Sequence, residues 1–311
     1  MFNHIKKFFR ETFRNSRAMT RLTAAITLAL PAVVGLVALQ ATVIGPLFRN
    51  RTFVTKLVSK MACALLGLKV VFNKKSAPLG KGKPTVNMYN HLSFLDPIVV
   101  GSAVDGLFVG KGELLKNKLL AGLLNLVGFI GVRRKREFNP QSNGKIIEQL
   151  NRGESINYYP QGTVVPKPEV TQFHAGLLEP FYGGEAINKR GEPIALKRDV
   201  ATQAFALNVV RVGKHRRGAK TTDNNKLFAA YGDPAPGKGM WSKIWECMKI
   251  NQTIEITAFP VKEPEAYDNA RDLANQAALD VASIINPLQA EAIRQNKATF
   301  PKAKIPFSPS P

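Results

Sequence analysis

A strand, a histidine and a helix start follow one another in Thr85-Val86-Asn87-Met88-Tyr89-Asn90-His91-Leu92-Ser93-Phe94-Leu95-Asp96-Pro97. We expect residues 85–89 to form a buried strand that delivers Asn90 and His91 at its end. A histidine near neutral pH can take a proton from an attacking hydroxyl, and a carboxylate on its other ring nitrogen fixes the tautomer. The stretch therefore favours a proton-abstracting pair, His91 and Asp96. The alternative interpretation is structural, with Asp96 as a helix N-cap and Pro97 at the first helical position, or with Ser93-x-x-Asp96 as a loose capping box.

Short strands and helices alternate on both sides of this stretch. Helices are expected at residues 53–68, 97–104, 114–127 and 270–284, and strands at 70–72, 106–110, 129–133, 155–159, 205–212, 226–231 and 253–258. This alternation predicts an α/β fold, a mixed sheet with flanking helices, whose sites lie at strand ends. Residues 214–220 are expected to form a basic hairpin loop.

Further blocks follow the histidine in a fixed order. They are Lys111-Gly112-Glu113-Leu114, Gly128-Phe129-Ile130-Gly131-Val132-Arg133-Arg134, Tyr159-Pro160-Gln161-Gly162-Thr163 and Phe173-His174-Ala175-Gly176. Together with Asn90–Asp96, this ordered set resembles the glycerolipid acyltransferase family, whose best known members are 1-acylglycerol-3-phosphate acyltransferases. The resemblance covers about residues 50–285.

The resemblance implies O-acyl transfer from an acyl thioester to a hydroxyl of a lysophospholipid, above all 1-acylglycerol-3-phosphate. His91 would be the general base and Asp96 would orient it, with no acyl-enzyme. Substrate would be bound by Asn90, Ser93, Lys111, Arg134, Gln161, Gly162 and Thr163, and backbone amides near Gly162 would stabilise the oxyanion. No cofactor is implied, and the acyl donor would be acyl-coenzyme A or acyl carrier protein.

Two positions depart from the family pattern. The family's F-P-E-G-T-R block has a glutamate and an arginine where this chain has Gln161 and Val164. An amide can still bond a hydroxyl, but valine cannot grip a phosphate as an arginine does. The departures leave the acceptor open. The family's last apolar block has two candidates, Pro193–Leu196 and Phe205–Val209.

Charge and cysteine content limit the partners. The chain has 44 Lys and Arg against 22 acidic residues, a net charge of +22, which favours polyanions such as anionic lipid or a phosphorylated substrate. Because no nucleic-acid-binding signature is present, we expect no nucleic-acid partner. Cys63 and Cys247 form no disulfide spacing and fit a reducing compartment. Four dispersed histidines predict no metal site.

The N-terminal segment predicts membrane attachment. Residues 1–21 combine six basic residues with aromatic ones, as in an interfacial helix, and no charged residue occurs from Leu22 to Phe48. We expect residues 22–49 to form a membrane-embedded helix or helical pair; a cleaved signal peptide or a buried helix are the alternatives. Basic residues flank both ends, so the positive-inside rule does not choose an orientation. The resemblance places the catalytic domain, residues 50–286, on the cytosolic face of the cytoplasmic membrane. Residues 287–311 are expected to be a poorly ordered tail.

Other functions fit parts of the pattern. A non-catalytic protein could use the same scaffold to bind anionic lipid. The departures from the family pattern at Gln161 and Val164 favour this hypothesis. The same His–Asp pair could hydrolyse thioesters if water replaced the lipid hydroxyl. The basic run Arg133–Arg136 could clamp a phosphate or form a solvated strand end that faces an anionic membrane.

Overall fold

The computed structural model describes residues 2–39, 42, 52–116, 121, 124, 129–132, 139–217 and 221–302. The chain divides into two compact units. Unit 1 contains Met1–Val71, Ser93–Val104 and Val209–Glu255, and unit 2 contains Phe72–Leu92, Asp105–Asn208 and Ile256–Pro311. His91 therefore belongs to unit 2 and Asp96 to unit 1.

Helices and short strands alternate along the chain, as the sequence predicts. The α-helices are α1 (Phe2–Ala24), α2 (Leu30–Leu39), α4 (Thr52–Leu66), α5 (Asp96–Gly101), α7 (Asn139–Asn151), α8 (Thr221–Gly232), α9 (Met240–Lys249), α10 (Ala270–Ile285) and α11 (Pro287–Arg294). The strands are β1 (Leu68–Phe72), β2 (Thr85–Tyr89), β3 (Leu107–Lys111), β4 (Ile130–Val132), β5 (Ile156–Tyr158), β6 (Ala201–Val212), β7 (His215–Arg216) and β8 (Gln252–Ala258). Short 3-10 turns lie at η3 (Gly112–Lys116), η5 (Glu179–Tyr182) and η6 (Pro264–Ala266).

The strands form a mixed sheet in the order β1-β8-β6-β2-β5-β3-β4, with β7 paired to β6. β2 runs parallel to both β5 and β6, and β3 runs parallel to β5 and β4. β7 is antiparallel to β6, which gives the basic hairpin expected around residue 214. The predicted α/β class with a mixed sheet and flanking helices is confirmed.

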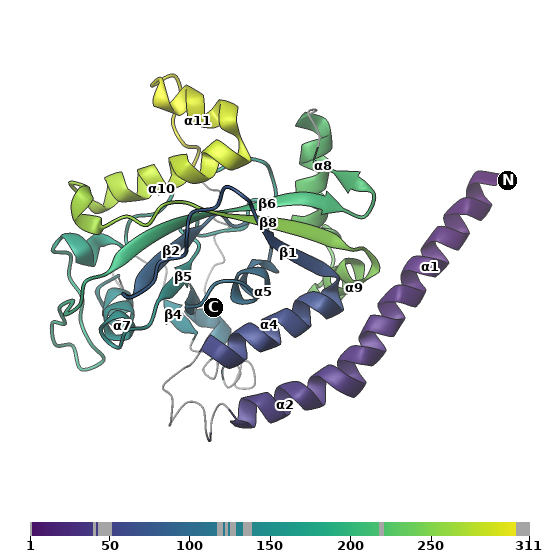
Figure 1. The fold of residues 1–311 in the computed structure, drawn as a ribbon, viewed down its shortest axis with the longest axis horizontal. Helices are drawn as coiled ribbons and strands as arrows, with labels where there is room; N and C mark the ends of the chain where they lie inside the picture. Colours follow the sequence, from purple (N-terminus) through teal and green to yellow (C-terminus); the bar gives the residue numbers. More distant parts are fainter. Residues whose placement is uncertain are drawn as a thin grey trace. The chain divides into compact units, whose positions relative to one another are not determined.

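Strand β2 lies at the centre of unit 2. All five of its residues are buried, which is the pattern of a parallel strand covered on both faces. Figure 1 shows α10 along one side of the unit 2 strands and α7 on the other, where α7 contacts β4 and β5. Helix α10 begins at an Asn269 cap, whose side chain accepts the backbone N–H groups of Arg271 and Asp272. Its buried face consists mostly of alanine, which lets the helix pack close to the sheet.

The N-terminal helix of unit 1 continues from α1 through a π-helical turn, η1 (Ala25–Ala29), into α2. Pro31 explains the irregular turn, since proline has no N–H to donate and its ring clashes with the preceding turn. The helix changes direction between α1 and α2 (Figure 1). Residues Phe9–Leu36 are long and apolar enough to cross a membrane, judged by length and composition, and their most apolar window is not buried. Of residues 40–49, which end the predicted membrane segment, only Thr42 lies within the described residues.

Most of the helix predicted at residues 114–127 lies outside the described residues. The structure corrects two other predicted elements. Residues 226–231 lie in helix α8 and not in a strand, because Leu227, Phe228 and Tyr231 share one buried helical face. Residues 287–294 form helix α11 within the predicted disordered tail. The Asn286 side chain caps this helix at Gln289, and the Gln289 side chain forms hydrogen bonds with both backbone groups of Val170.

Both cysteines are free, buried thiols of unit 1. Burial raises the pKa of Cys63 and raises the pKa of Cys247 to about 11. Because the thiolate is the reactive form, we expect neither cysteine to react with a maleimide in the folded protein at pH 8, and both to react within minutes in denaturant. Mass spectrometry of the labelled protein measures this. Rapid labelling of the folded protein would contradict the described burial.

Candidate active site

The predicted site residues of unit 2 follow the carboxyl ends of neighbouring parallel strands. His91 comes two residues after β2, Lys111 is the last residue of β3, and the Tyr159–Thr163 block comes directly after β5. Parallel strands end at one edge of the sheet, and that edge is where α/β proteins bind their ligands. Lys111 pairs in register with Val132 of β4. Arg134, two residues beyond Val132, lies outside the described residues.

Asn90 fixes the point where the chain leaves strand β2. Its side-chain Nδ2 donates to the Leu207 carbonyl at 3.0 Å, and its Oδ1 accepts the Leu207 N–H at 2.7 Å. The amide thus continues the pairing of β2 with β6 one residue beyond the strand. Asn90 is fully buried, so the structure gives it a positioning role, and its predicted contact with substrate stays untested.

The main chain of His91 is held from two sides by one loop. Its N–H donates to Gln161 Oε1 at 2.6 Å, and its carbonyl accepts the N–H of Val165 at 2.7 Å. We call residues 159–165 the clamp loop. Because both backbone groups of His91 are bonded to this loop, the histidine cannot move without the loop, and the residue as a whole is half-buried.

Gln161 is fully buried and bonded at both ends of its amide. While Oε1 accepts from His91, Nε2 donates to Thr171 Oγ1 at 2.8 Å. Burying a neutral amide with both partners satisfied is far less costly than burying a carboxylate. The Gln161 side chain has 0% exposure and positions His91. The predicted role of Gln161 in positioning the acceptor stays a prediction.

Aromatic rings stack beneath and beside the histidine. The His91 ring stacks on Tyr159 with centroids 4.4 Å apart, Tyr159 lies 5.7 Å from Tyr89, and Tyr89 stacks on Phe205 at 4.8 Å. The stack fixes the plane of the imidazole from one side. Tyr159 occupies the position of the phenylalanine in the family's F-P-E-G-T block. The family pattern therefore predicts an aromatic residue here, but it does not predict the contact with His91.

A polar network joins the strands below this stack. Asn157 of β5 accepts from Asn87 Nδ2 at 2.9 Å and from the Tyr89 hydroxyl at 3.1 Å. Burial raises the pKa of Tyr89 well above its usual value, so the hydroxyl keeps its proton and remains a donor. The network therefore links β2 to β5 through side chains as well as through the backbone.

A tight turn places Gly162 in the clamp loop. The Gly162 N–H donates to the Tyr159 carbonyl at 3.0 Å, and its φ of 71° lies in the left-handed region that favours glycine. The Gly162 N–H is thus used inside the turn, and the prediction that backbone amides near Gly162 stabilise the oxyanion stays untested. Thr163 and Val164 follow it and are half-buried.

In unit 1, Asp96 is a fully buried carboxylate with defined partners. Its Oδ2 accepts the Ser93 N–H at 2.9 Å, and its Oδ1 accepts the Tyr231 hydroxyl at 2.7 Å. Ser93 Oγ in turn donates to the Tyr231 carbonyl at 3.1 Å. Helix α5 begins at Asp96 itself, with Leu95 as its N-cap, so the expectation that Asp96 is the cap is wrong by one residue.

The sequence does not predict Tyr231 as a site residue, because the pattern of residues 226–231 favours a strand. Helix α8 carries it to the Ser93–Asp96 turn, where its hydroxyl and carbonyl hold both residues. The structure describes the surroundings of His91 and Asp96 separately, one in each unit. The pairing of their side chains stays a prediction from their spacing of five residues.

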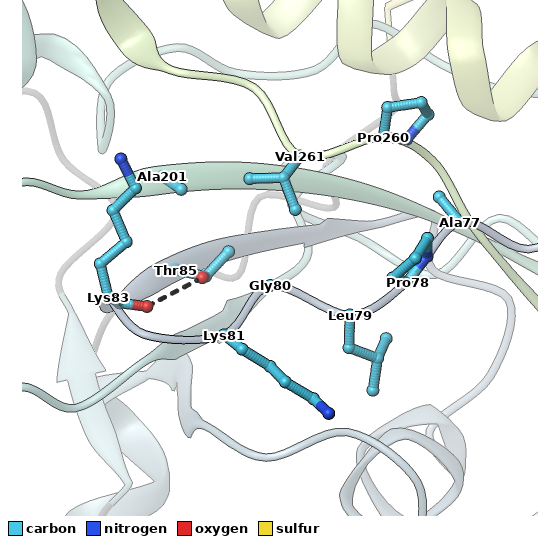
Figure 2. Close-up of a pocket in the computed structure, with 10 residues that line it drawn as sticks. All are labelled: Ala77, Pro78, Leu79, Gly80, Lys81, Lys83, Thr85, Ala201, Pro260 and Val261. Atoms are coloured by element: carbon cyan, nitrogen blue, oxygen red, sulfur yellow. Dashed lines mark hydrogen bonds between the residues drawn. The ribbon is translucent and has the colours of Figure 1, made fainter.

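A surface pocket of about 430 Å³ lies at the other end of strand β2 (Figure 2). Thr85 and Ala201, the first residues of β2 and β6, line it together with Leu79, Lys81 and Val261. It is separate from the edge that holds His91. Among the described residues, no group of three or more His, Cys, Asp or Glu side chains could hold a metal ion.

Comparison with known proteins supports the predicted family. Residues 70–182, which include the His91 block, Lys111 and the clamp loop, match the family named Acyltransferase. The matched segment is 113 residues of the 311 in the chain, and it shows what this part of the chain is similar to. The segment starts within β1 and ends with η5, so it contains the parallel strands β2, β3, β4 and β5.

Two curated proteins to which this chain is similar are both named lyso-ornithine lipid O-acyltransferase. The protein from Pseudomonas aeruginosa is 26% identical over 191 residues, which cover 58% of this chain and 70% of the relative. The protein from Rhizobium meliloti is 32% identical over 106 residues, which cover 33% of this chain and 35% of the relative. The chain therefore spans about a third of the second relative.

A solved structure shares the fold of this chain. The 1-acyl-sn-glycerophosphate acyltransferase PlsC from Thermotoga maritima superposes with a TM-score of 0.54 at 17% identity, over 91% of this chain and 97% of that one. At this identity the likeness shows the fold alone.

Replacing Gln161 tests its positioning role. In Gln161→Ala the His91 N–H and the Thr171 hydroxyl lose buried partners, so we expect the free energy of unfolding to fall by about 1–3 kcal/mol. We also expect kcat for acyl transfer to fall while the acceptor KM changes less than threefold. Thermal unfolding in detergent and steady-state kinetics measure these effects.

Gln295→Ala is the matched control, because Gln295 is exposed and its side chain bonds only Glu291 nearby. It should change neither quantity. A Gln161→Ala variant with a raised acceptor KM and an unchanged kcat would instead show that Gln161 contacts the acceptor.

Proposed function

We propose that this protein transfers a fatty acyl group from an acyl thioester to a hydroxyl of a lysolipid in the membrane. One observation carries the proposal. The main chain of His91 is locked by the clamp loop at the carboxyl edge of the parallel strands, inside an acyltransferase domain. That arrangement fixes a base beside the place where a substrate binds.

The reaction follows from one base. The imidazole of His91 takes the proton of the acceptor hydroxyl while the hydroxyl oxygen attacks the thioester carbonyl carbon. The tetrahedral intermediate then collapses, the C–S bond breaks, and the imidazolium returns the proton to the leaving thiolate. The products are an acyl ester and a free thiol, and no acyl-enzyme forms. In this scheme Asp96, buried and held by Ser93 and Tyr231, orients the imidazole.

Among acceptors, a lysolipid without a phosphate has the stronger support. The position after Thr163 is Val164, which is half-buried and supplies no charge where the family pattern has an arginine. An ornithine headgroup carries an amino group and a carboxylate and no phosphate. The names of both curated relatives agree with this choice. We therefore propose lyso-ornithine lipid as the first acceptor to test.

The second acceptor is 1-acylglycerol-3-phosphate, which the ordered sequence blocks predict. Lys111 at the end of β3 favours it, since an ammonium at the ligand-binding edge can hold a phosphate oxygen. Arg134 is proposed to act beside it. The acyl donor is proposed to be acyl-coenzyme A or acyl carrier protein, with no further cofactor.

The N-terminal helix would attach the protein to the membrane. Its candidate span, Phe9–Leu36, would anchor the domain where a lysolipid acceptor and its product reside. We propose the cytoplasmic membrane, with the catalytic domain on the cytosolic side where acyl thioesters are made.

Replacing the base tests the enzyme reading. Membranes with His91→Ala should transfer labelled acyl groups at least a hundredfold more slowly than the parent, because general base catalysis contributes about 10²–10⁴-fold. The assay measures acylated lipid and free fatty acid with both acceptors present. His215→Ala is the control, since His215 is exposed on strand β7.

Equal transfer by parent and His91→Ala membranes would contradict the proposed base. An inactive parent that still binds anionic vesicles would favour a lipid-binding scaffold. Free acid without acylated lipid would show a hydrolase.

Replacing Val164 tests the acceptor. Val164→Arg supplies the guanidinium of the family pattern, and a charge-assisted hydrogen bond contributes about 1.5–3 kcal/mol. We expect kcat/KM for 1-acylglycerol-3-phosphate to rise about tenfold or more relative to lyso-ornithine lipid. Val164→Leu, which adds bulk without charge, should leave the ratio unchanged. A parent protein that already prefers the phosphate, together with an unchanged ratio in Val164→Arg, would show that position 164 does not select the acceptor.

A further inference from the structure

The end of unit 2 lies far along the chain from His91 but contacts the surroundings of the clamp loop. We define the C-terminal segment as residues 286–302, which include helix α11 and the stretch that follows it. Helix α11 contacts α10 (Figure 1), and its Ala290 is 1% exposed. The C-terminal segment lies outside residues 70–182, which match the family named Acyltransferase. Its contacts are therefore not part of the pattern that indicates the family.

Gln289 joins the C-terminal segment to Val170. Its Oε1 accepts the Val170 N–H at 3.1 Å, and its Nε2 donates to the Val170 carbonyl at 2.8 Å. Val170 is fully buried, so an unpaired backbone group at this residue would carry the cost of its desolvation. The Asn286 side chain accepts the Gln289 N–H at 3.2 Å, which fixes Gln289 in the first turn of α11. One side chain thus satisfies both backbone groups of a buried residue.

A second contact joins the same stretch of chain to the C-terminal segment. The Gln172 N–H donates to the Pro301 carbonyl at 3.0 Å, two residues beyond Val170. Thr171 lies between these two contacts and is buried. Residues 170–174 belong to no helix or strand, so their position depends on contacts of this kind.

The same stretch also contacts the clamp loop. Thr171 Oγ1 accepts from Gln161 Nε2 at 2.8 Å, and Gln161 Oε1 accepts the His91 N–H at 2.6 Å. The His174 N–H donates to the Pro160 carbonyl at 2.9 Å. A continuous set of contacts therefore runs from the C-terminal segment to the backbone of the proposed base.

We propose that Gln289 is a positioning residue for His91, which acts through Thr171 and Gln161. Its two hydrogen bonds fix Val170, and the next residue along the chain is Thr171, whose hydroxyl is thereby kept in place for Gln161. The catalytic part of this inference rests on the proposed acyl transfer. The holding of the His91 backbone does not, and it is measured without any reaction.

Hydrogen exchange of the full-length protein in detergent tests the holding directly. In Gln289→Ala we expect the peptide that contains the His91 amide to exchange about tenfold faster, because its bond to Gln161 opens more often. Peptides from strands β3 and β8 should exchange as in the parent. Gln295→Ala is the matched control, since Gln295 is exposed and its side chain bonds only Glu291 nearby.

Replacing Thr171 tests the path between the two ends. Thr171→Val removes the hydroxyl and keeps a similar shape, whereas Thr171→Ser keeps the hydroxyl. We expect Thr171→Val to speed exchange at His91 as Gln289→Ala does, and Thr171→Ser to exchange as slowly as the parent. The double variant of Thr171→Val and Gln289→Ala should exchange less than the product of the two single effects predicts, because both break one chain of contacts. Thr171→Val also supplies the measurement if Gln289→Ala does not fold.

Acyl transfer by the same variants measures the catalytic part. In Gln289→Ala we expect kcat to fall about 5–30-fold, since a misplaced base is costly, while the acceptor KM changes less than threefold. If the parent transfers no acyl group to any acceptor, the proposed function fails. The exchange measurement then still decides whether Gln289 holds His91.

Three results would overturn the proposal. Unchanged exchange at His91 in Gln289→Ala would show that the influence of Gln289 ends at Val170. Faster exchange throughout unit 2 would show that Gln289 supports the whole fold and not the histidine in particular. A raised acceptor KM with an unchanged kcat would place the C-terminal segment against the acceptor.

Discussion

The candidate site depends on the two hydrogen bonds that hold the backbone of His91 to the clamp loop. A histidine at the end of a strand has a fixed Cα position but a free exit direction, and Gln161 and Val165 remove that freedom. The loop is itself tied down further along the chain, because Gln161 bonds Thr171 and the neighbouring Val170 bonds Gln289 at the start of α11. The backbone of His91 is thus held by the clamp loop, by Thr171 through Gln161, and by helix α11 through Val170. These contacts can fix the position of a loop residue as firmly as a strand fixes its own residues.

The residue types alone predict the elements with a clear hydrophobic pattern. These are β2, an uninterrupted buried strand, and β8, whose apolar and polar residues alternate; the order of the blocks after the strand ends can also be read from the sequence. The pattern of residues 226–231 favours a strand wrongly, because Leu227, Phe228 and Tyr231 are compatible with either a strand or a helix period over so short a span. Helix α11 was missed because its stability comes from Asn286 and from the contact of Gln289 with Val170, which is a tertiary contact.

The roles of single polar side chains were harder to predict than their positions. The chemical types of Asn90 and Gln161 suit a substrate contact and a backbone contact equally well, since an amide both donates and accepts. Only the direction of the side chain separates the two roles, and direction follows from the neighbouring strand or loop. For Tyr231 the position itself could not be predicted, because the residues near Asp96 do not indicate a hydrogen-bond partner 135 positions away.

The buried amide of Gln161 also bears on how the protein meets changes in acidity. A carboxylate at this place would gain or lose a proton as its surroundings changed, and each protonation state would favour a different bonding pattern with the His91 N–H and the Thr171 hydroxyl. An amide has no such second state within the physiological range. The support beneath the histidine therefore keeps one geometry when a cell acidifies, so that any response of the enzyme to acidity must originate elsewhere in the molecule or in its lipids.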